Sequence, residues 1–311
     1  MKKSENKVRN LIIVGLALLV ALILIYAPLP DSVTYVGDAE LTQAGQTAMA
    51  ILIFALILWM TEAIPFHITG LIGMLLMALF KIDSFKAVVQ SGFGNDIIIF
   101  FIGVLILSAF ITRSGLGKRI SVLILSKTGN NTHFIILGFL VTGVVLSMWI
   151  TDMAVAAMLM PLAVSIAKEE GIKPMESNFG KALLISTAWG PIIGGIATPA
   201  GCGANPLAVG FLKEMAGIDV TFAGWMMYGL PAALLLILPT WGILLLFFKP
   251  EMKYLKKSKE ELVENFNSFS KPDREEKITI ILFLMTVVLW LASPFLSKWL
   301  GISIQISMLV L

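Results

Sequence analysis

The sequence predicts an all-α polytopic membrane protein. Its 311 residues are 58% hydrophobic and only 14% charged, whereas soluble domains are about 45 to 50% apolar. The mean hydropathy is +0.91, and the apolar residues gather in runs long enough to cross a bilayer as helices. Together these three features predict several membrane-spanning helices joined by polar loops.

The rest of the composition argues against several functional classes. The formal net charge is only +3, and so small a value argues against a nucleic-acid surface. Cys202 is the single cysteine, so an internal disulfide or a cysteine metal cluster is excluded. The sequence also lacks the paired acids, serine–histidine pair or histidine-rich zinc spacing that an intramembrane hydrolase would need. We therefore expect neither an enzyme nor a bound cofactor.

The N-terminal part contains three expected spans. A start with four basic residues precedes the apolar run 11–27, and such a flank favours a cytoplasmic N-terminus. The acidic stretch 28–43 is then expected on the opposite side. Runs 44–60 and 66–80 follow, separated by Thr61-Glu62-Ala63-Ile64-Pro65, where the proline favours a break in the helix.

A fourth span is expected over 96–112, after an external loop at 81–95. The span leads into a cluster of basic residues that favours the cytoplasmic side. Segment 116–126 mixes bases with an apolar face, a pattern typical of a helix that lies along the membrane interface.

The apolar run 134–166 contains the feature around which we interpret the chain. As one helix its roughly 33 residues would be about 50 Å long, more than the hydrocarbon core of about 30 Å. Basic residues flank both ends, which predicts that both lie on the cytoplasmic side. A re-entrant helical hairpin that turns at Thr151-Asp152 satisfies both constraints.

The polar turn of this hairpin predicts a functional site. Backbone that leaves helical geometry inside a membrane is tolerated only beside protein or a water-filled cavity. An unpaired aspartate there costs roughly 2.5 to 3.5 kcal/mol, so Asp152 requires a cation, a proton or a partner. The alternative is a tilted, kinked pair of helices in which Asp152 only caps the second helix.

A fifth span begins at 177–187 and is expected to break down over 189–206. This stretch contains five glycines and three prolines, which an uninterrupted helix does not accommodate. Transporters use unwound carbonyls and half-helix ends to coordinate sodium and anionic groups. Glycine-mediated helix packing is the alternative, but it does not account for Thr198-Pro199 or Asn205-Pro206.

Two further spans are expected at 225–248 and 278–291. The connector between them carries many charges of both signs, which predicts a solvated, partly helical cytoplasmic loop. The apolar stretch 302–311 is too short to cross a bilayer, so we expect the chain to be incomplete. Five parts result: N-terminal spans with the interfacial helix (1–127), hairpin and broken helix (128–216), sixth span (217–248), charged loop (249–277) and last part (278–311).

Three motifs resemble those of a known family. They are the Thr61-Glu62-Ala63-Ile64-Pro65 turn, Ser147-Met148-Trp149 before the hairpin turn, and Gly194-Gly195-Ile196-Ala197-Thr198 leading to Asn205. With them the sequence resembles the divalent anion/sodium symporter family, which includes sodium-coupled dicarboxylate, citrate and sulfate transporters. The resemblance implies an inverted-repeat homodimer with an elevator motion, of which this chain holds the first repeat and the truncated start of the second.

The resemblance also implies which residues form the site. In the family the hairpin turn reads Ser-Asn-Thr and helps to bind both sodium and the substrate carboxylate, whereas the matching positions here are Thr151, Asp152 and Met153. The aspartate adds a carboxylate, and the methionine removes a hydroxyl. The expected cation-binding residues are Thr151, Asp152, Thr198, Gly201 and Asn205, and the expected substrate-binding residues are Thr151, Asp152, Met153, Thr198 and Pro199.

These features predict a secondary active transporter of the cell membrane that couples symport of a small divalent, organic or inorganic anion to Na⁺. Its expected partners are the anion, Na⁺ or H⁺, the lipid bilayer and a second copy of the chain. Two alternatives stay open at this point. Asp152 would titrate in a proton-coupled transporter, and a truncated half-transporter would transport nothing.

Overall fold

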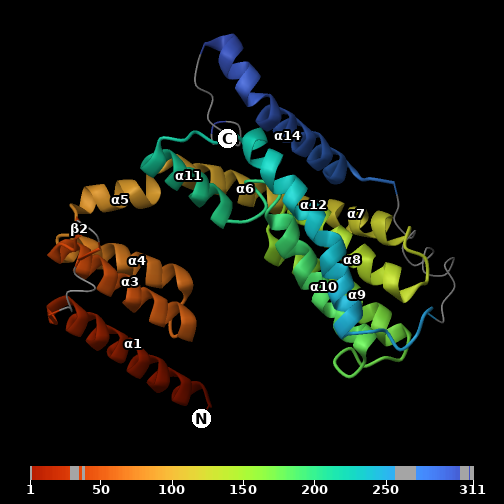
Figure 1. The fold of residues 1–311 in the computed structure, drawn as a ribbon, viewed down its shortest axis with the longest axis horizontal. Coiled ribbons are helices and arrows are strands. Elements are labelled where there is room, and N and C mark those ends of the chain that lie inside the picture. Colours follow the sequence, from red (N-terminus) through yellow and green to blue (C-terminus); the bar gives the residue numbers. More distant parts are fainter. Residues whose placement is uncertain (1, 29–34, 37–38, 256–270, 302–307, 309–311) are drawn as a thin grey trace. The chain divides into compact units, whose positions relative to one another are not determined.

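The computed structural model describes residues 2–28, 35–36, 39–255, 271–301 and 308. The chain forms two compact units, 1–95 and 96–311, and Figure 1 shows the helices of each. The apolar segment expected near the end of the chain lies almost wholly outside the described residues, as does the middle of the charged loop.

In its described residues, the first unit consists of four helices and one minimal strand pair. Helices α1 and α3 pack together around Ala17, Ala21, Phe54 and Leu58. The side-chain amide of Gln46 donates to two carbonyls at the end of α1 and so satisfies acceptors that the helix leaves open. The bounds are α1 Lys2–Tyr26, α3 Gln43–Thr61, α4 Phe66–Leu79, α5 Phe85–Phe93, β1 Tyr35–Val36 and β2 Ala39–Glu40.

Two details of this unit differ from the sequence prediction. The expected loop 81–95 contains helix α5, whose first turn is capped because the Ser84 hydroxyl accepts from the backbone N–H of Ala87 at 3.2 Å. Strands β1 and β2 pair antiparallel over two residues each, so the described chain is not purely α-helical. Serine at an N-cap is a local signal that the hydropathy argument did not use.

The second unit contains the helices that surround the candidate site. Their bounds are α6 Asp96–Arg113, α7 Leu116–Leu125, α8 Thr132–Ser147, α9 Asp152–Glu169, α10 Asn178–Gly195, α11 Ala204–Ala216, α12 Phe222–Phe247 and α14 Arg274–Leu300.

Five helical segments of the described chain are long and apolar enough to cross a membrane. They are Lys7–Tyr26, Gln43–Thr61, Phe85–Arg113, Phe222–Phe247 and Arg274–Leu300. Helix α8 is apolar but has only 16 residues, or about 24 Å at 1.5 Å per residue, which is shorter than a hydrocarbon core. The expected polytopic helical architecture is confirmed, and the re-entrant placement of α8 and α9 stays a prediction.

Helices α8 and α10 form the centre of the second unit, where they lie side by side (Figure 1). A Cβ atom on Gly194 of α10 would lie 2.3 Å from the backbone oxygen of Val144 on α8. Only glycine allows backbones to approach this closely, a device that membrane helices use often. Large buried side chains such as Phe139, Leu140 and Phe179 complete the core around this contact.

Three helix ends expected from the sequence were wrong, namely the end of α10 and both ends of α14. Helix α10 continues through Pro191 to Gly195, and α14 begins at Arg274 and continues through Pro294. A proline removes one N–H from the helical ladder, but neighbouring helices can stabilise the rest of it, as is common in membrane helices. The Pro191 ring packs against α8, where a Cβ on Gly143 would lie 2.6 Å from the ring carbon Cδ.

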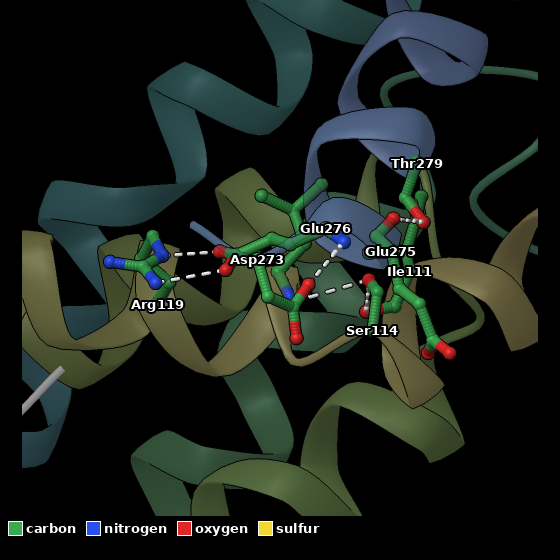
Figure 2. Close-up of polar contacts among 8 residues, drawn as sticks. Ile111, Ser114, Arg119, Asp273, Glu275, Glu276 and Thr279 are labelled. Atoms are coloured by element: carbon green, nitrogen blue, oxygen red, sulfur yellow. Dashed lines mark hydrogen bonds and ion pairs between the residues drawn. The ribbon is translucent and has the colours of Figure 1, made fainter. Parts of the chain in front are cut away.

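An ion pair connects α7 to the first turn of α14 (Figure 2). The Arg119 guanidinium donates through Nε and Nη2 to both carboxylate oxygens of Glu276. Glu276 is buried, and its own N–H donates to the N-cap carboxylate of Asp273 at 2.7 Å. This bidentate geometry fixes both the position and the direction of the side chains, so α7 is attached to the start of α14.

The first residues after α12 attach the connector to the starts of α8 and α10. The N–H of Thr132 donates to the carbonyl of Lys253 at 3.1 Å, and the N–H of Leu255 donates to Asn130 at 2.9 Å. The Glu251 carboxylate accepts from the N–H groups of Asn178 and Phe179 at the start of α10. This part of the charged loop is therefore packed rather than simply solvated, contrary to the sequence prediction.

Candidate cation and anion site

The hairpin turn and the helix break meet at Thr198. Residues 148–151 separate α8 from α9, and residues 196–203 separate α10 from α11. The fully buried Thr198 hydroxyl donates to the carbonyl of Met148 in the hairpin turn and accepts from the N–H of Ala200. Thr198 therefore connects the two irregular segments that the sequence singled out.

Asn205 closes the helix break from the other side. Its amide nitrogen donates to the carbonyl of Gly195 at 2.7 Å and to the carbonyl of Thr198 at 2.8 Å. Gly195 is the last residue of α10, and Asn205 lies in the first turn of α11. The amide oxygen of Asn205 makes no hydrogen bond within the described residues, which leaves it available as a ligand.

Gly201 lets the broken helix approach the end of α8. A Cβ at this position would lie 2.5 Å from the carbonyl oxygen of Ser147 and 2.8 Å from that of Gly195. Any larger residue would push these two carbonyls apart. Two helix ends and several backbone oxygens are consequently concentrated at one place.

Ser147 is a candidate site residue to which the sequence reasoning gave no role. Its side chain is fully buried, and its hydroxyl has no hydrogen-bond partner among the described residues. A buried unpaired hydroxyl costs about 1 to 3 kcal/mol, so it requires an explanation. A serine at the end of an apolar helix, directly before a polar turn, is the sequence signal that could have identified it.

The three residues expected at the tip of the hairpin have different environments. Thr151 is the N-cap of α9 but makes no side-chain cap bond. Asp152 is half-buried at the first helical position, and its carboxylate accepts from the N–H of Met153 at 2.9 Å. Met153 is 83% exposed. Of the described hydrogen bonds, none joins these three side chains to Thr198 or Asn205.

The structure therefore brings together only some of the expected site residues. Thr198, Gly201 and Asn205 form one buried cluster, with Pro199 buried beside them. The tip residues follow within a few positions of the Met148 carbonyl that binds this cluster. The buried cluster and the tip residues are therefore connected through the backbone of the hairpin turn and not by a hydrogen bond between their side chains.

Four helix ends give this region a mixed electrostatic character. Helices α8 and α10 end here, and their carbonyl ends carry partial negative charge that favours a cation. Helices α9 and α11 begin at the turn and the break, and their N–H ends carry partial positive charge that favours an anion. Such an arrangement suits a cation and an anion bound near each other.

Comparison with known proteins places the chain in a family of transporters. The sequence model described as "Citrate transporter" matches residues 56–311. The chain is 29% identical over 309 residues to the sodium-dependent dicarboxylate transporter SdcS of Staphylococcus saprophyticus, covering 95% of this chain and 57% of that protein. It is 30% identical over 269 residues to the SdcS protein of Staphylococcus aureus strain USA300, covering 84% and 52%.

The chain thus spans about half the length of the curated relatives that it matches. These relatives are transporters and not enzymes, which confirms the expected class of protein. The match to the citrate transporter model covers well over half of the chain, and all three motifs that resemble the divalent anion/sodium symporters lie within it. The chain therefore belongs to the citrate transporter family.

Proposed function

We propose that the protein is a secondary transporter that couples the symport of a small dicarboxylate, citrate or sulfate to Na⁺. The observation that carries the proposal is the meeting of the hairpin turn and the helix break through Thr198 and Asn205. This contact gathers two helix carbonyl ends and two helix N–H ends. The names of the relatives, which are sodium-dependent dicarboxylate transporters, support the same conclusion.

The proposed cation site consists of oxygen atoms, which are the ligands that hard cations prefer. Ser147 would contribute its unpaired hydroxyl, and Asn205 its free amide oxygen. Gly201 assists because it lets the backbone oxygens of the two helix ends approach. Thr151 and Asp152 would complete the site from the hairpin turn.

The proposed anion site lies at the start of α9. The residues there are Thr151, Asp152 and Met153, with Thr198 and Pro199 from the helix break. Asp152 creates an electrostatic conflict with a dicarboxylate. Two unit charges 4 Å apart interact by about 4 kcal/mol at an effective dielectric constant of 20. The charge of Asp152 must therefore be neutralised while the substrate is bound.

Two mechanisms would neutralise Asp152. In the first, its carboxylate is a ligand of Na⁺, so the turn is close to neutral when the anion binds. In the second, Asp152 takes up a proton, and transport uses H⁺ instead of or beside Na⁺. The names of the relatives, which are sodium-dependent dicarboxylate transporters, favour the first mechanism.

The larger assembly that the family resemblance implies is part of the same proposal. It comprises a homodimer in the cell membrane with cytoplasmic N-termini and a re-entrant hairpin. It also includes the elevator motion of a transport part formed mainly by 128–216. The short length of α8, at 16 residues, supports the re-entrant placement.

Uptake into proteoliposomes tests the proposed function. The complete protein is reconstituted, and uptake of labelled succinate, citrate and sulfate is measured with and without an inward Na⁺ gradient at several pH values. We expect one anion to accumulate only with Na⁺. If no anion moves under Na⁺ but one moves under a pH gradient, the proton mechanism replaces the sodium mechanism.

The variant Asp152→Asn distinguishes the two mechanisms. With Asp152 as a Na⁺ ligand, the Na⁺ concentration for half-maximal uptake rises in the variant. If uptake instead stays sodium-dependent and loses its pH dependence, the first mechanism is refuted. Asp83→Asn is the matched control, because the Asp83 carboxylate likewise accepts from the N–H of the next residue, Ser84, at 2.7 Å, and Asp83 belongs to the first unit.

A further inference from the structure

Five aromatic side chains connect the hairpin turn to α12, α14 and α6; we call them the aromatic column. Trp149 of the turn stacks on Phe222 at 6.3 Å between ring centroids, and Phe222 stacks on Trp290 at 4.6 Å. Phe283 meets Trp149 edge-on at 5.3 Å, and Phe100 contacts Trp290 at 5.7 Å. All four distances lie in the range in which aromatic pairs attract.

The far end of the aromatic column is a rigid support. Trp290 and Phe222 are fully buried, and Phe100 is 1% exposed. Rings packed at interior density cannot shift without opening a cavity or clashing with their neighbours. The near end, Trp149, is only half-buried, so its position depends on the rings that it touches.

Trp149 lies next to residues that carry candidate groups of the site. Its neighbour Met148 provides the carbonyl that accepts from Thr198, and the unpaired hydroxyl of Ser147 is one residue further back. The rings of the aromatic column offer no oxygen atom, which is the ligand that a hard cation prefers. The aromatic column therefore contributes no ligand itself, and it contacts the hairpin turn at Trp149.

We propose that Trp149 is a positioning residue of the cation site, held by Phe222 and Phe283, and that this contact sets the affinity for Na⁺. The inference rests on the proposed function, because it concerns the same site. A binding site loses affinity when its ligands are held loosely by about 1 Å. The turn has only four residues between two helices, so releasing its one large aromatic side chain loosens all of its backbone oxygens.

The test uses the complete protein in liposomes and two readouts. The first is the Na⁺ concentration for half-maximal anion uptake. The second is the rate at which a maleimide alkylates Cys202, followed by mass spectrometry of the peptide that contains it. Cys202 lies in the helix break, where a Cβ on Gly195 would lie 3.3 Å from the cysteine Cβ. Its reaction reports on the packing of residues 196–203 and requires no transported substrate.

We expect Trp149→Ala to raise the half-saturating Na⁺ concentration about tenfold, the change that loss of two aromatic contacts of ordinary strength produces. Maximal uptake should change less than about twofold, and alkylation of Cys202 should accelerate severalfold. Trp149→Phe, which keeps a ring, should restore values near the native ones. Trp299→Ala is the control, because Trp299 is 82% exposed.

A milder pair of variants keeps the proposal testable if Trp149→Ala fails to fold. Phe283→Ala removes only the edge-on partner and should change both readouts in the same direction, whereas Leu284→Ala, at its exposed neighbour, should change neither. Equal Cys202 alkylation in the Phe283 and Leu284 variants would overturn the inference, as would a lower maximal uptake at an unchanged half-saturating Na⁺ concentration. If the native protein moves no anion under Na⁺, the proposed function fails, and the alkylation rates still decide whether Trp149 positions the turn against the helix break.

Discussion

Replacing Asn205 tests the contact that closes the helix break. In Asn205→Ala the carbonyl of Gly195 loses the hydrogen bond that it receives at 2.7 Å and becomes a buried unpaired acceptor. The carbonyl of Thr198 loses one bond but keeps the N–H of Gly201 at 3.3 Å. Loss of the bond to Thr198 costs about 1 kcal/mol, and the buried carbonyl of Gly195 left unpaired costs about 1 to 3 kcal/mol. The variant should therefore be destabilised by about 2 to 4 kcal/mol.

Asn205→Asp should be less stable to unfolding than Asn205→Ala. The carboxylate has the shape of the amide but donates no hydrogen bond, so it faces the two carbonyl oxygens at 2.7 and 2.8 Å with like charge. We expect the order of stability to be native, then alanine, then aspartate. An amide that served only to fill space would instead give aspartate nearly the stability of asparagine.

The free energy of unfolding, measured by denaturant titration of the complete protein in detergent, provides the assay. Asn178→Ala is the control, because the side chain of Asn178 has no hydrogen-bond partner among the described residues. The reasoning is refuted if Asn205→Ala is within about 0.5 kcal/mol of this control, which is the usual range for an unimportant surface change.

Three more predictions follow from the contacts around the site. Gly194→Ala should cost about 3 kcal/mol or more, because the new Cβ would lie 2.3 Å from the oxygen of Val144. Arg119→Ala should cost about 1 to 3 kcal/mol, since it leaves the buried carboxylate of Glu276 without the guanidinium. Burial tends to raise the pKa of Glu251, but hydrogen bonds from the start of α10 outweigh it and lower the pKa below its ordinary value of 4.5. Glu251→Gln should therefore lose a small stabilisation, below about 1 kcal/mol for an exposed group, that is fully present above pH 4.5 and disappears as the pH falls through the lowered pKa.

Matched variants control these three predictions. A Cβ on Gly242 would meet no other atom within 4 Å, so Gly242→Ala should be tolerated. Arg113→Ala and Glu62→Gln remove exposed charges. The packing argument is contradicted if Gly194→Ala is as stable as Gly242→Ala in unfolding titrations. The ion-pair argument is contradicted if Arg119→Ala is as stable as Arg113→Ala. A Glu251→Gln difference that is the same at pH 3 and pH 7 would contradict the capping argument.

Properties of short stretches of sequence were enough to predict much of the second unit. The length of the apolar run 134–166 and its polar centre predicted the turn between α8 and α9, which the structure places at 148–151. The glycines and prolines predicted a helix break, which the structure confines to 196–203. Both are properties of a short stretch of chain, namely its length, its hydropathy and its backbone restrictions.

The helix ends were predicted less well because tertiary contacts decide them. Pro191 and Pro294 were expected to follow the end of a helix, yet α10 and α14 continue through both. A single proline weakens a helix locally, whereas packing against neighbouring helices stabilises it over its whole length. Helix α5 was missed for a different reason, since its apolar face is short and its signal was the serine cap.

By itself the sequence determined the membrane class, the approximate spans, the two interruptions and the family resemblance, since these depend on composition and on residues close together in the chain. Only the tertiary structure decided which groups meet at the interruptions. Thr198 reaches Met148 across 50 positions, Ser147 is left without a partner among the described residues, and Trp149 rests on rings from α12 and α14. Such contacts depend on how helices pack, and packing is set by the shapes of many side chains together rather than by any single segment.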